Sequence, residues 1–339
     1  TDYHDGFVLP AVIPQRTHAA LRGRDDRRVR AWSAGAGGRP QQYELGSETP
    51  GRGWLDYVQG VTRALARRGL AVPGFDLRLE SSVPIGAGVT SSAALEVSVQ
   101  RALRTRFDLA LDDIELARAA QEAETQFVGA PVGIMDQVAS SLGRDGEVLF
   151  LDTQTLAFER IPLPGAADLV VIDSGIVHKH AGGEYVTRRR ESFEAAAQLG
   201  LARLRDAGPD TLSQLAALDP ALARRARHVI TENGRVCDAA SALRDGDLQR
   251  FGRLMNVSHA SMRDDYEMST REIDLLVGLA QQDAEVFGAR LTGGGFGGAI
   301  VALVRAGAGA PAGARVVAAF KAAAGLNATV LVPGIFNTL

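Results

Sequence analysis

The chain has 339 residues, more than one compact core usually holds, so two domains are expected. A hydrophobic content of 46% with 23% charged residues is typical of a soluble globular protein. The net charge of −3 gives no reason to expect a nucleic-acid partner. No apolar run approaches the roughly eighteen residues of a membrane helix, and the N-terminus lacks the apolar stretch of a signal peptide. We therefore expect a cytoplasmic monomer with neither nucleic-acid nor membrane partners.

Cysteine and lysine usage excludes two further classes. A single cysteine, Cys237, rules out an internal disulfide and any metal site built from several cysteines. Lys179 and Lys321 are the only lysines, and neither follows a glycine loop. A P-loop kinase needs a lysine there, so any ATP must be held in another way.

Strand and helix patterns alternate in the first half of the chain. Periodicity predicts strands at 8–13, 28–34, 75–79 and 148–151, and helices at 54–68, 91–107 and 111–127. Residues 168–173 are strongly apolar and predict a central strand.

The second half is mostly helical from residue 184 to about residue 279. It closes with predicted strands at 299–304 and 328–331 around a helix at 314–324. A turn-rich segment at 163–166 (LPGA) predicts a boundary that gives domains of 1–164 and 165–339.

The first segment with chemical content is residues 84–96 (PIGAGVTSSAALE), between a predicted strand and a predicted helix. Free N–H groups and the helix dipole favour an anion at such a point. Small residues let a phosphate approach the backbone, and Thr90, Ser91 and Ser92 offer hydroxyl groups to its oxygens or to magnesium. The alternative is a serine-rich helix N-cap after a tight turn.

The second segment is residues 291–298 (LTGGGFGG). It contains a G-x-G-x-x-G pattern, but a strand is predicted after it, where a dinucleotide-binding fold needs a helix. Five glycines in six positions exceed the needs of a hairpin and indicate close packing on the backbone. A turn and a substrate-binding loop both remain open.

The third segment is residues 132–137 (VGIMDQ), preceded by Glu124 at the end of a helical pattern. Asp136 lies in an apolar sequence, which is unfavourable for a merely solvated carboxylate. It either caps the following helix or serves phosphoryl transfer, which needs one carboxylate near the attacking hydroxyl and another for magnesium. The residues alone leave both possibilities open.

These three segments, in this order, resemble the motifs of the GHMP kinases. Residues 84–94 are similar to the family's phosphate loop, and residues 291–298 to its C-terminal glycine loop. Within the family, residues 1–10 (TDYHDGFVLP) and 133–137 (GIMDQ) resemble the galactokinase group. Further similarity runs through residues 174–190 and 255–267, so the resemblance covers nearly the whole chain.

The resemblance implies an α/β (α+β) fold with two lobes and an active site in the cleft between them. Residues 1–164 would form the lobe with the phosphate loop and the catalytic aspartate, and residues 165–339 the lobe with the glycine loop. The implied reaction transfers the γ-phosphoryl group of ATP to the anomeric hydroxyl of α-D-galactose, with Mg2+, by direct in-line displacement.

The family roles transfer residue by residue. Asp136 would be the catalytic carboxylate. The sugar would be bound by Asp2, Gly133 and Tyr185. The ATP phosphates would be wrapped by Gly86, Gly88, Thr90, Ser91 and Ser92, and magnesium would be held by Ser92 and Glu124.

Other positions carry weaker expectations. Gly294 and Gly295 would line the cleft, and Trp54 and Tyr57 would either stack on adenine or form helix core. His4, where relatives carry asparagine, is expected to be an exposed loop residue.

Two alternatives stay open: a GHMP kinase for another sugar, such as N-acetylgalactosamine or arabinose, and a non-catalytic sensor of galactose and ATP. A sensor should have a damaged phosphate loop, whereas residues 91–94 (SSAA) are intact. The galactokinase signature begins before Thr1, with an arginine and a Glu-His pair. We therefore expect the natural protein to continue upstream.

Overall fold

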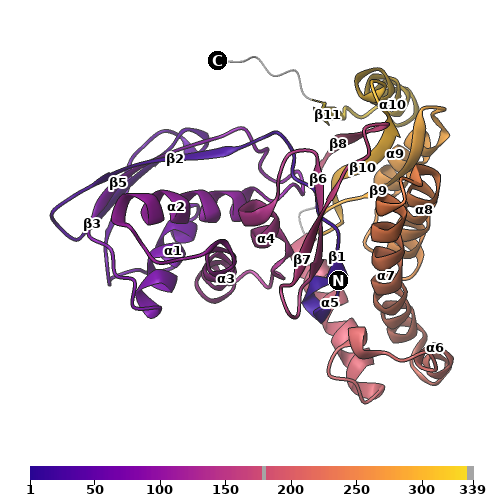
Figure 1. Cartoon of the computed structure of the whole chain (residues 1–339), viewed down its shortest axis with the longest axis horizontal. Coiled ribbons are helices and arrows are strands. Elements are labelled where there is room, and N and C mark those ends of the chain that lie inside the picture. The colour runs from indigo at the N-terminus through magenta and orange to yellow at the C-terminus, as the bar shows by residue number, and fades with distance from the viewer. Residues whose placement is uncertain (178–180, 334–339) are drawn as a thin grey trace. The chain divides into compact units, whose positions relative to one another are not determined.

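The computed structural model describes residues 1–177 and 181–333 (Figure 1). The chain forms two compact units: unit 1 comprises Thr1–Leu9, Gly86–Val89 and Gly146–Leu339, and unit 2 comprises Pro10–Ile85 and Thr90–Asp145. These units do not coincide with the predicted domains 1–164 and 165–339. The reason is packing, because the strands at Phe7–Val8 and Phe158–Pro162 belong to one sheet and contact the helix Pro220–Arg244 of the C-terminal half.

Unit 2 contains a four-stranded sheet in the order β2-β5-β3-β4. Strands β2 and β5 are antiparallel, β3 and β5 are parallel, and β3 and β4 are antiparallel. Their bounds are β2 Thr17–Gly23, β3 Arg28–Ser33, β4 Gln41–Glu44 and β5 Phe75–Ser81.

Helices cover one face of this sheet (Figure 1), namely α1 Leu55–Arg67, α2 Ser91–Phe107, α3 Asp113–Glu122, the π-helix Ala123–Val128 and α4 Met135–Leu142. Alternation along β3 explains the arrangement. Val29 and Ala31 are fully buried under the helices, whereas Arg28 and Arg30 are exposed on the other face.

Unit 1 contains two sheets, with strand orders β1-β6-β7 and β11-β8-β10-β9. Strand β8 lies inside its sheet between β11 and β10, which confirms the predicted central strand. The bounds are β1 Phe7–Val8, β6 Glu147–Asp152, β7 Phe158–Pro162, β8 Ala167–Val177, β9 Val286–Leu291, β10 Gly297–Arg305 and β11 Thr329–Val332.

The strand predicted at 8–13 is wrong in extent, because only Phe7 and Val8 form β1. Pro10 and Pro14 lack the N–H groups that a continued ladder requires.

Five helices of eight or more residues accompany the sheets of unit 1 in the described chain, namely α5 Ala181–Gln198, α7 Pro220–Arg244, α8 Leu248–Asp264, α9 Arg271–Gln282 and α10 Gly309–Ala324. The short helix α6 Thr211–Gln214 lies between α5 and α7. Figure 1 shows α8, α9 and α10 beside the β9 and β10 strands. Within residues 1–177 and 181–333, no helix combines the length and apolar character needed to cross a bilayer.

Candidate active site

The phosphate loop connects β5 to α2, as predicted, and its backbone is unusual. Gly86, Gly88 and Thr90 have φ angles of 80°, 70° and 63°. Glycine tolerates this left-handed region, but it is an outlier for a β-branched threonine. Thr90 is the N-cap of α2 and makes no side-chain capping bond to it. The N-terminal N–H groups of α2 therefore keep their capacity to bind an anion.

Two glycine-rich segments of unit 1 pack directly against each other. A β-carbon added at Gly293 would lie 2.5 Å from the carbonyl oxygen of Gly88, and one added at Gly298 would lie 3.2 Å from that of Ala87. Only glycine permits this approach of backbone to backbone. The phosphate loop and the C-terminal glycine loop thus form one backbone surface in unit 1.

The glycine loop itself connects β9 to β10. A strand follows it, as the sequence predicts, so the dinucleotide-binding interpretation is excluded. Phe296 in this loop has a φ of 59°, and its N–H donates to the carbonyl oxygen of Met268 at 2.7 Å. The loop is therefore held from two sides, by the phosphate loop and by the segment that follows α8.

A buried carboxyl pair in unit 2 includes the predicted magnesium ligand. Glu124 is 4% exposed on the π-helix Ala123–Val128, and Glu96 on α2 is fully buried. The Nε2 of Gln137 donates to Oε2 of Glu124 at 2.8 Å. The hydroxyl of Ser92 lies close enough to Glu124 to lower the pKa of that carboxyl group. Four polar side chains from three helices therefore converge at this point.

Burial dominates the electrostatics of this pair. It raises the pKa of Glu124, and the neighbouring polar groups of Ser92, Gln137 and Glu96 offset part of the increase. Burial and the charge of Glu124 together raise the pKa of Glu96 well above its usual range. Burial therefore favours the protonated form of both carboxyl groups, and it does so more strongly at Glu96.

The donor set fits magnesium. Hydroxyl and carboxylate oxygens are its preferred protein ligands, and Ser92 and Glu124 lie close enough for the hydroxyl to influence the pKa of the carboxyl group. No group of three or more His, Cys, Asp or Glu side chains suited to a metal occurs among residues 1–177 and 181–333. A magnesium ion at Ser92 and Glu124 would take its remaining ligands from waters and substrate phosphates.

Asp136 is the second residue of α4, and Ile134 is the N-cap of that helix. Asp136 is therefore not the N-cap, which was one of its two interpretations. Its carboxylate lies in the first helical turn, where the dipole favours negative charge. The next residue in the chain, Gln137, donates to Glu124 of the carboxyl pair. Gly133 lies in the loop before α4.

An aromatic cluster in unit 1 contains Tyr185, one of the predicted sugar residues, and Tyr3, the chain neighbour of another, Asp2. Asp2 opens the short 3-10 helix Asp2–His4, and Tyr185 lies near the start of α5. The ring of Tyr3 is 6.2 Å from that of Tyr185, edge to face, and 6.1 Å from that of Tyr266. Residues 178–180 of the resembling segment 174–190 lie outside the described chain.

Tyr185 also reaches the glycine loop. Its Cδ2 lies 3.9 Å from where a β-carbon of Gly294 would be. Within unit 1, the phosphate loop, the glycine loop, Tyr185 and the turn that carries Asp2 therefore form a continuous series of contacts.

The expectation that His4 is an exposed loop residue is wrong. His4 is fully buried, its Nε2 lies 3.0 Å from Oγ of Ser192, and its Nδ1 accepts the N–H of Leu204. Its ring stacks on Phe193 with centroids 4.2 Å apart. His4 therefore anchors the turn that carries Asp2 to helix α5 and the segment after it.

Two buried histidines should make the stability of the protein sensitive to acid. Burial lowers the pKa of His4 and of His228 to about 3. Below pH 6.5 the unfolded chain takes up protons that the folded protein excludes, so stability falls as pH falls toward 3. Each histidine should contribute a slope of about 1.4 kcal/mol per pH unit below pH 6.

His4→Gln should reduce this slope by one histidine's share, whatever its effect on stability at neutral pH. Urea unfolding between pH 7 and pH 4.5 measures it, with His18→Gln, an exposed residue on β2, as the control. If the free energy of unfolding has the same pH dependence in wild type and His4→Gln, the buried His4 does not cause the sensitivity to acid.

Trp54 and Tyr57 flank the start of α1 and differ in their surroundings. Trp54 packs against the core of unit 2, which favours its interpretation as helix core. Tyr57 is half-buried, and its pKa is raised by burial and then by the charges of Glu124 and Glu96. Tyr57 therefore lies close to the carboxyl pair.

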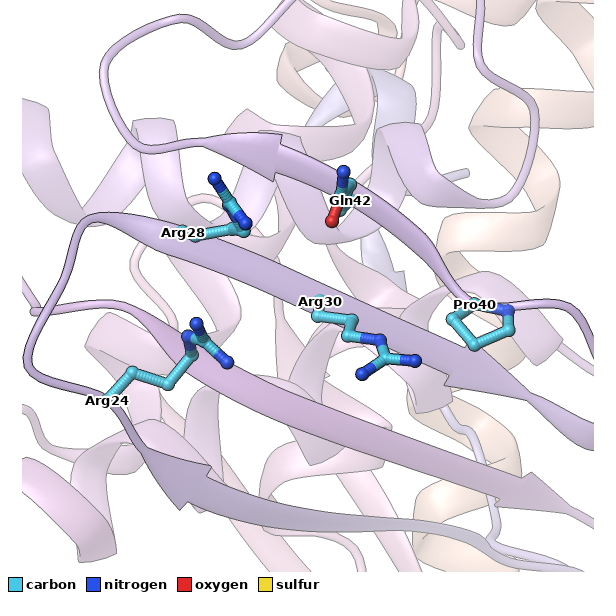
Figure 2. A pocket seen from close by; sticks show the side chains of 5 residues that line it. All are labelled: Arg24, Arg28, Arg30, Pro40 and Gln42. Atoms are coloured by element: carbon cyan, nitrogen blue, oxygen red, sulfur yellow. The ribbon is translucent and has the colours of Figure 1, made fainter.

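A pocket of about 460 Å3 lies elsewhere in unit 2 (Figure 2), lined by Arg24, Arg28, Arg30, Pro40 and Gln42. Arg28 and Arg30 alternate with buried Val29 on β3, so the pocket is on the sheet face that points away from the helices. Ser92 and Glu124 belong to the helical layer. The pocket is thus not part of the candidate site.

Two site residues escaped the sequence reasoning. Glu96 follows Ser92 by four residues on α2, and this spacing places both on one helical face. A glutamate one helical turn after Ser92, on the same face of the helix, is the signal that could have identified it. Gln137 follows Asp136, and nothing in its local sequence distinguishes it from a solvated residue.

The chain matches two family descriptions, the GHMP kinases N terminal domain over residues 56–144 and the GHMP kinases C terminal domain over residues 239–322. Lactococcus lactis galactokinase, solved in complex with galactose, is 32% identical with a TM-score of 0.92, over 97% of this chain and 88% of that chain. This chain therefore belongs to the GHMP kinase family and has the fold of that family, whose members are ATP-dependent kinases.

More distant structures agree on the fold. Methanococcus jannaschii mevalonate kinase is 16% identical with a TM-score of 0.69, over 97% of this chain and 92% of that chain. Streptococcus pneumoniae phosphomevalonate kinase, in complex with phosphomevalonate and AMPPNP, is 14% identical with a TM-score of 0.70, over 98% and 94%.

Proposed function

We propose that this kinase phosphorylates the anomeric hydroxyl of α-D-galactose from ATP, giving galactose 1-phosphate and ADP. The observation that carries the choice of sugar is the similarity to Lactococcus lactis galactokinase, whose structure holds galactose, over 97% of the chain. The residues that resemble the galactokinase signature support it, because Tyr3 and Tyr185 meet beside the glycine loop in unit 1.

In this proposal Asp136 accepts the proton of the anomeric hydroxyl. The hydroxyl oxygen forms a bond to the γ-phosphorus while the bond from that phosphorus to the β–γ bridging oxygen breaks and leaves ADP. Gly86, Gly88 and the N-terminus of α2, with Thr90, Ser91 and Ser92, bind the phosphate oxygens. Because the protein makes no covalent intermediate, its contribution is positioning and charge stabilisation.

Magnesium, when bound by Ser92 and Glu124, neutralises charge on the phosphate oxygens. Gln137 orients Glu124 through its amide N–H, and the buried carboxyl group of Glu96 lies close to the same side chain. Asp2 and Tyr185 bind sugar hydroxyls together with the backbone at Gly133. Tyr185 also offers its ring to the apolar face of the sugar.

Ser92→Ala and Glu124→Gln should each raise the magnesium concentration for half-maximal rate by about tenfold. Each change removes one oxygen ligand, and the remaining ligands, waters and phosphates retain the ion more weakly. Magnesium titrations of the initial rate at saturating substrates measure this effect.

Matched controls are Ser98→Ala on the same helix, whose hydroxyl donates to the Leu95 carbonyl, and Glu122→Gln, which pairs with Arg67 and Arg68. If the magnesium dependence of Ser92→Ala and Glu124→Gln equals that of the controls, the metal is held elsewhere.

A coupled assay of ADP release across galactose, N-acetylgalactosamine and arabinose tests the proposed substrate. We expect the highest kcat/KM with galactose. Higher activity on another sugar would identify a different GHMP sugar kinase. Binding of galactose and ATP without ADP release would identify a sensor.

A further inference from the structure

The segment that joins α8 to α9 contains a residue in a conformation that its type disfavours. Glu267 has a φ of 54°, in the left-handed region that side-chain-bearing residues seldom adopt. Such a conformation costs free energy and persists only where the surroundings hold it in place. Glu267 has no part in the proposed chemistry, so the question is what holds it and what depends on it.

Three arginines hold the carboxylate of Glu267. Arg225 donates to its Oε2 at 2.6 Å, Arg224 to its Oε1 at 2.9 Å, and Arg188 lies 3.4 Å from Oε2. Arg225 is itself 2% exposed, and its other N–H groups donate to Glu191 at 2.8 Å and to the Asp265 carbonyl at 2.5 Å. Helices α5 and α7 thus fix one short segment through a single carboxylate.

The glycine loop rests on the residue after Glu267. The carbonyl of Met268 accepts the N–H of Phe296 at 2.7 Å. A β-carbon at Gly295 would lie 2.5 Å from that same oxygen, so the loop is packed closely against it. A change in the backbone at Glu267 would therefore move the surface that supports the glycine loop.

The same ionic cluster reaches the proposed sugar site. Arg188 follows Tyr185 by three residues on α5, one helical turn, and contacts both Glu267 and Glu191. Tyr185 in turn packs beside Gly294. The position of Tyr185 and the position of the glycine loop thus depend on one set of ion pairs.

We propose that Glu267 is a positioning residue that fixes the glycine loop and the N-terminal part of α5 in one arrangement, so that nucleotide and sugar binding both depend on it. The sugar half of this inference rests on the proposed function. Without the carboxylate, Arg225 keeps only Glu191 as a charged partner, and the segment at 265–268 loses the contacts that hold its left-handed residue.

Two variants distinguish the effect of the Glu267 carboxylate from the effect of the left-handed backbone conformation. Glu267→Gln keeps the size of the side chain and removes the charge, whereas Glu267→Gly removes the side chain and relieves the left-handed conformation. The matched control is Asp264→Asn, which removes a carboxylate three residues earlier that is 60% exposed and pairs with exposed Arg263. We expect both Glu267 variants to raise the KM of ATP and of galactose by about tenfold each, with Asp264→Asn unchanged.

The division between KM and kcat distinguishes positioning from simple destabilisation. A loss of folded enzyme lowers the apparent kcat and leaves both KM values unchanged, and that result would overturn the inference. Wild-type KM values in Glu267→Gly would overturn it as well, since the carboxylate would then be unnecessary. Where a Glu267 variant does not fold, Arg224→Gln removes one partner at a half-exposed position and should raise both KM values about threefold.

Nucleotide binding alone keeps this test independent of the proposed sugar. The dissociation constant of a fluorescent ATP analogue, measured without any sugar, should rise about tenfold in Glu267→Gln and Glu267→Gly. If wild type does not phosphorylate galactose but this increase is observed, the proposed substrate is wrong and the role of Glu267 in the glycine loop stands. If the dissociation constant is unchanged, the role of Glu267 is wrong whatever the sugar.

Discussion

Asp136→Asn should lower kcat by about 100- to 10,000-fold while the affinity for ATP changes little. The amide keeps the size of the carboxylate but cannot accept the proton of the sugar hydroxyl. The position of Asp136 in the first turn of α4, next to Gln137 and its contact with Glu124, motivates this expectation. Single-turnover kinetics and calorimetric titration with ATP measure the two quantities separately.

The control for Asp136→Asn is Asp145→Asn, a residue of the same unit that is 75% exposed and pairs with Arg16. It makes the same change of charge away from the carboxyl pair and should leave turnover unchanged. Near-wild-type turnover in Asp136→Asn would remove Asp136 from the mechanism. A weaker affinity for ATP with intact kcat would make Asp136 a nucleotide-binding residue instead.

Gly293→Ala should reduce kcat/KM for ATP by roughly a hundredfold, because it displaces the two glycine-rich loops from each other. Gly293 has a φ of 78°, which disfavours alanine. The added methyl group would also lie 2.5 Å from the carbonyl oxygen of Gly88, which is backbone and cannot rotate away. Both loops would have to shift by an appreciable fraction of an ångström.

Gly294→Ala is a closely matched control for this change. Gly294 does not have a left-handed backbone, and the atom nearest to its added methyl group is Cδ2 of Tyr185 at 3.9 Å, an ordinary contact. The nucleotide kinetics of this variant should stay close to those of wild type. Equal losses in Gly293→Ala and Gly294→Ala would show that any added methyl group harms the loop, and the argument from the Gly88 contact would fail.

Elements with strong local signals could be predicted from the sequence. The helix predicted at 91–107 coincides with α2, and the strand predicted at 28–34 with β3, which ends one residue earlier. Both have a clear periodicity and a turn at the boundary. The phosphate loop and the glycine loop could be located because runs of glycine and small residues have few structural uses.

Strands whose sequences carry only a weak apolar alternation were missed. In β2, Thr17–Gly23, residues are alternately half-buried and exposed, and none is fully buried. In β4, Gln41–Glu44, three of the four residues are polar or charged. Such strands are stabilised by pairing with distant partners, as β2 is by β5, and a local pattern carries little of that information.

The surroundings of single residues were equally inaccessible to the sequence. His4 looks like a polar turn residue, and its burial depends on Ser192 and Leu204, which are 188 and 200 positions away. The carboxylate of Glu267 meets Arg224 and Arg225, which are 43 and 42 positions away. The types of residue at the site could be predicted from motifs, but the ion pairs and hydrogen bonds that orient them depend on the fold.

Because Glu124 lies in the π-helix Ala123–Val128, the position of its carboxylate depends on the number of residues in this turn. Such a turn arises when one extra residue is accommodated within an α-helix. Deleting Ala123, which joins α3 to Glu124, would rotate the chain from Glu124 onward by about 100° relative to α3. The carboxylate of Glu124 would then leave Ser92 and Gln137, although every one of these side chains would still be present. Among natural variants of this chain, substitutions on the exposed side of the turn should therefore be common, and insertions or deletions within it should be rare.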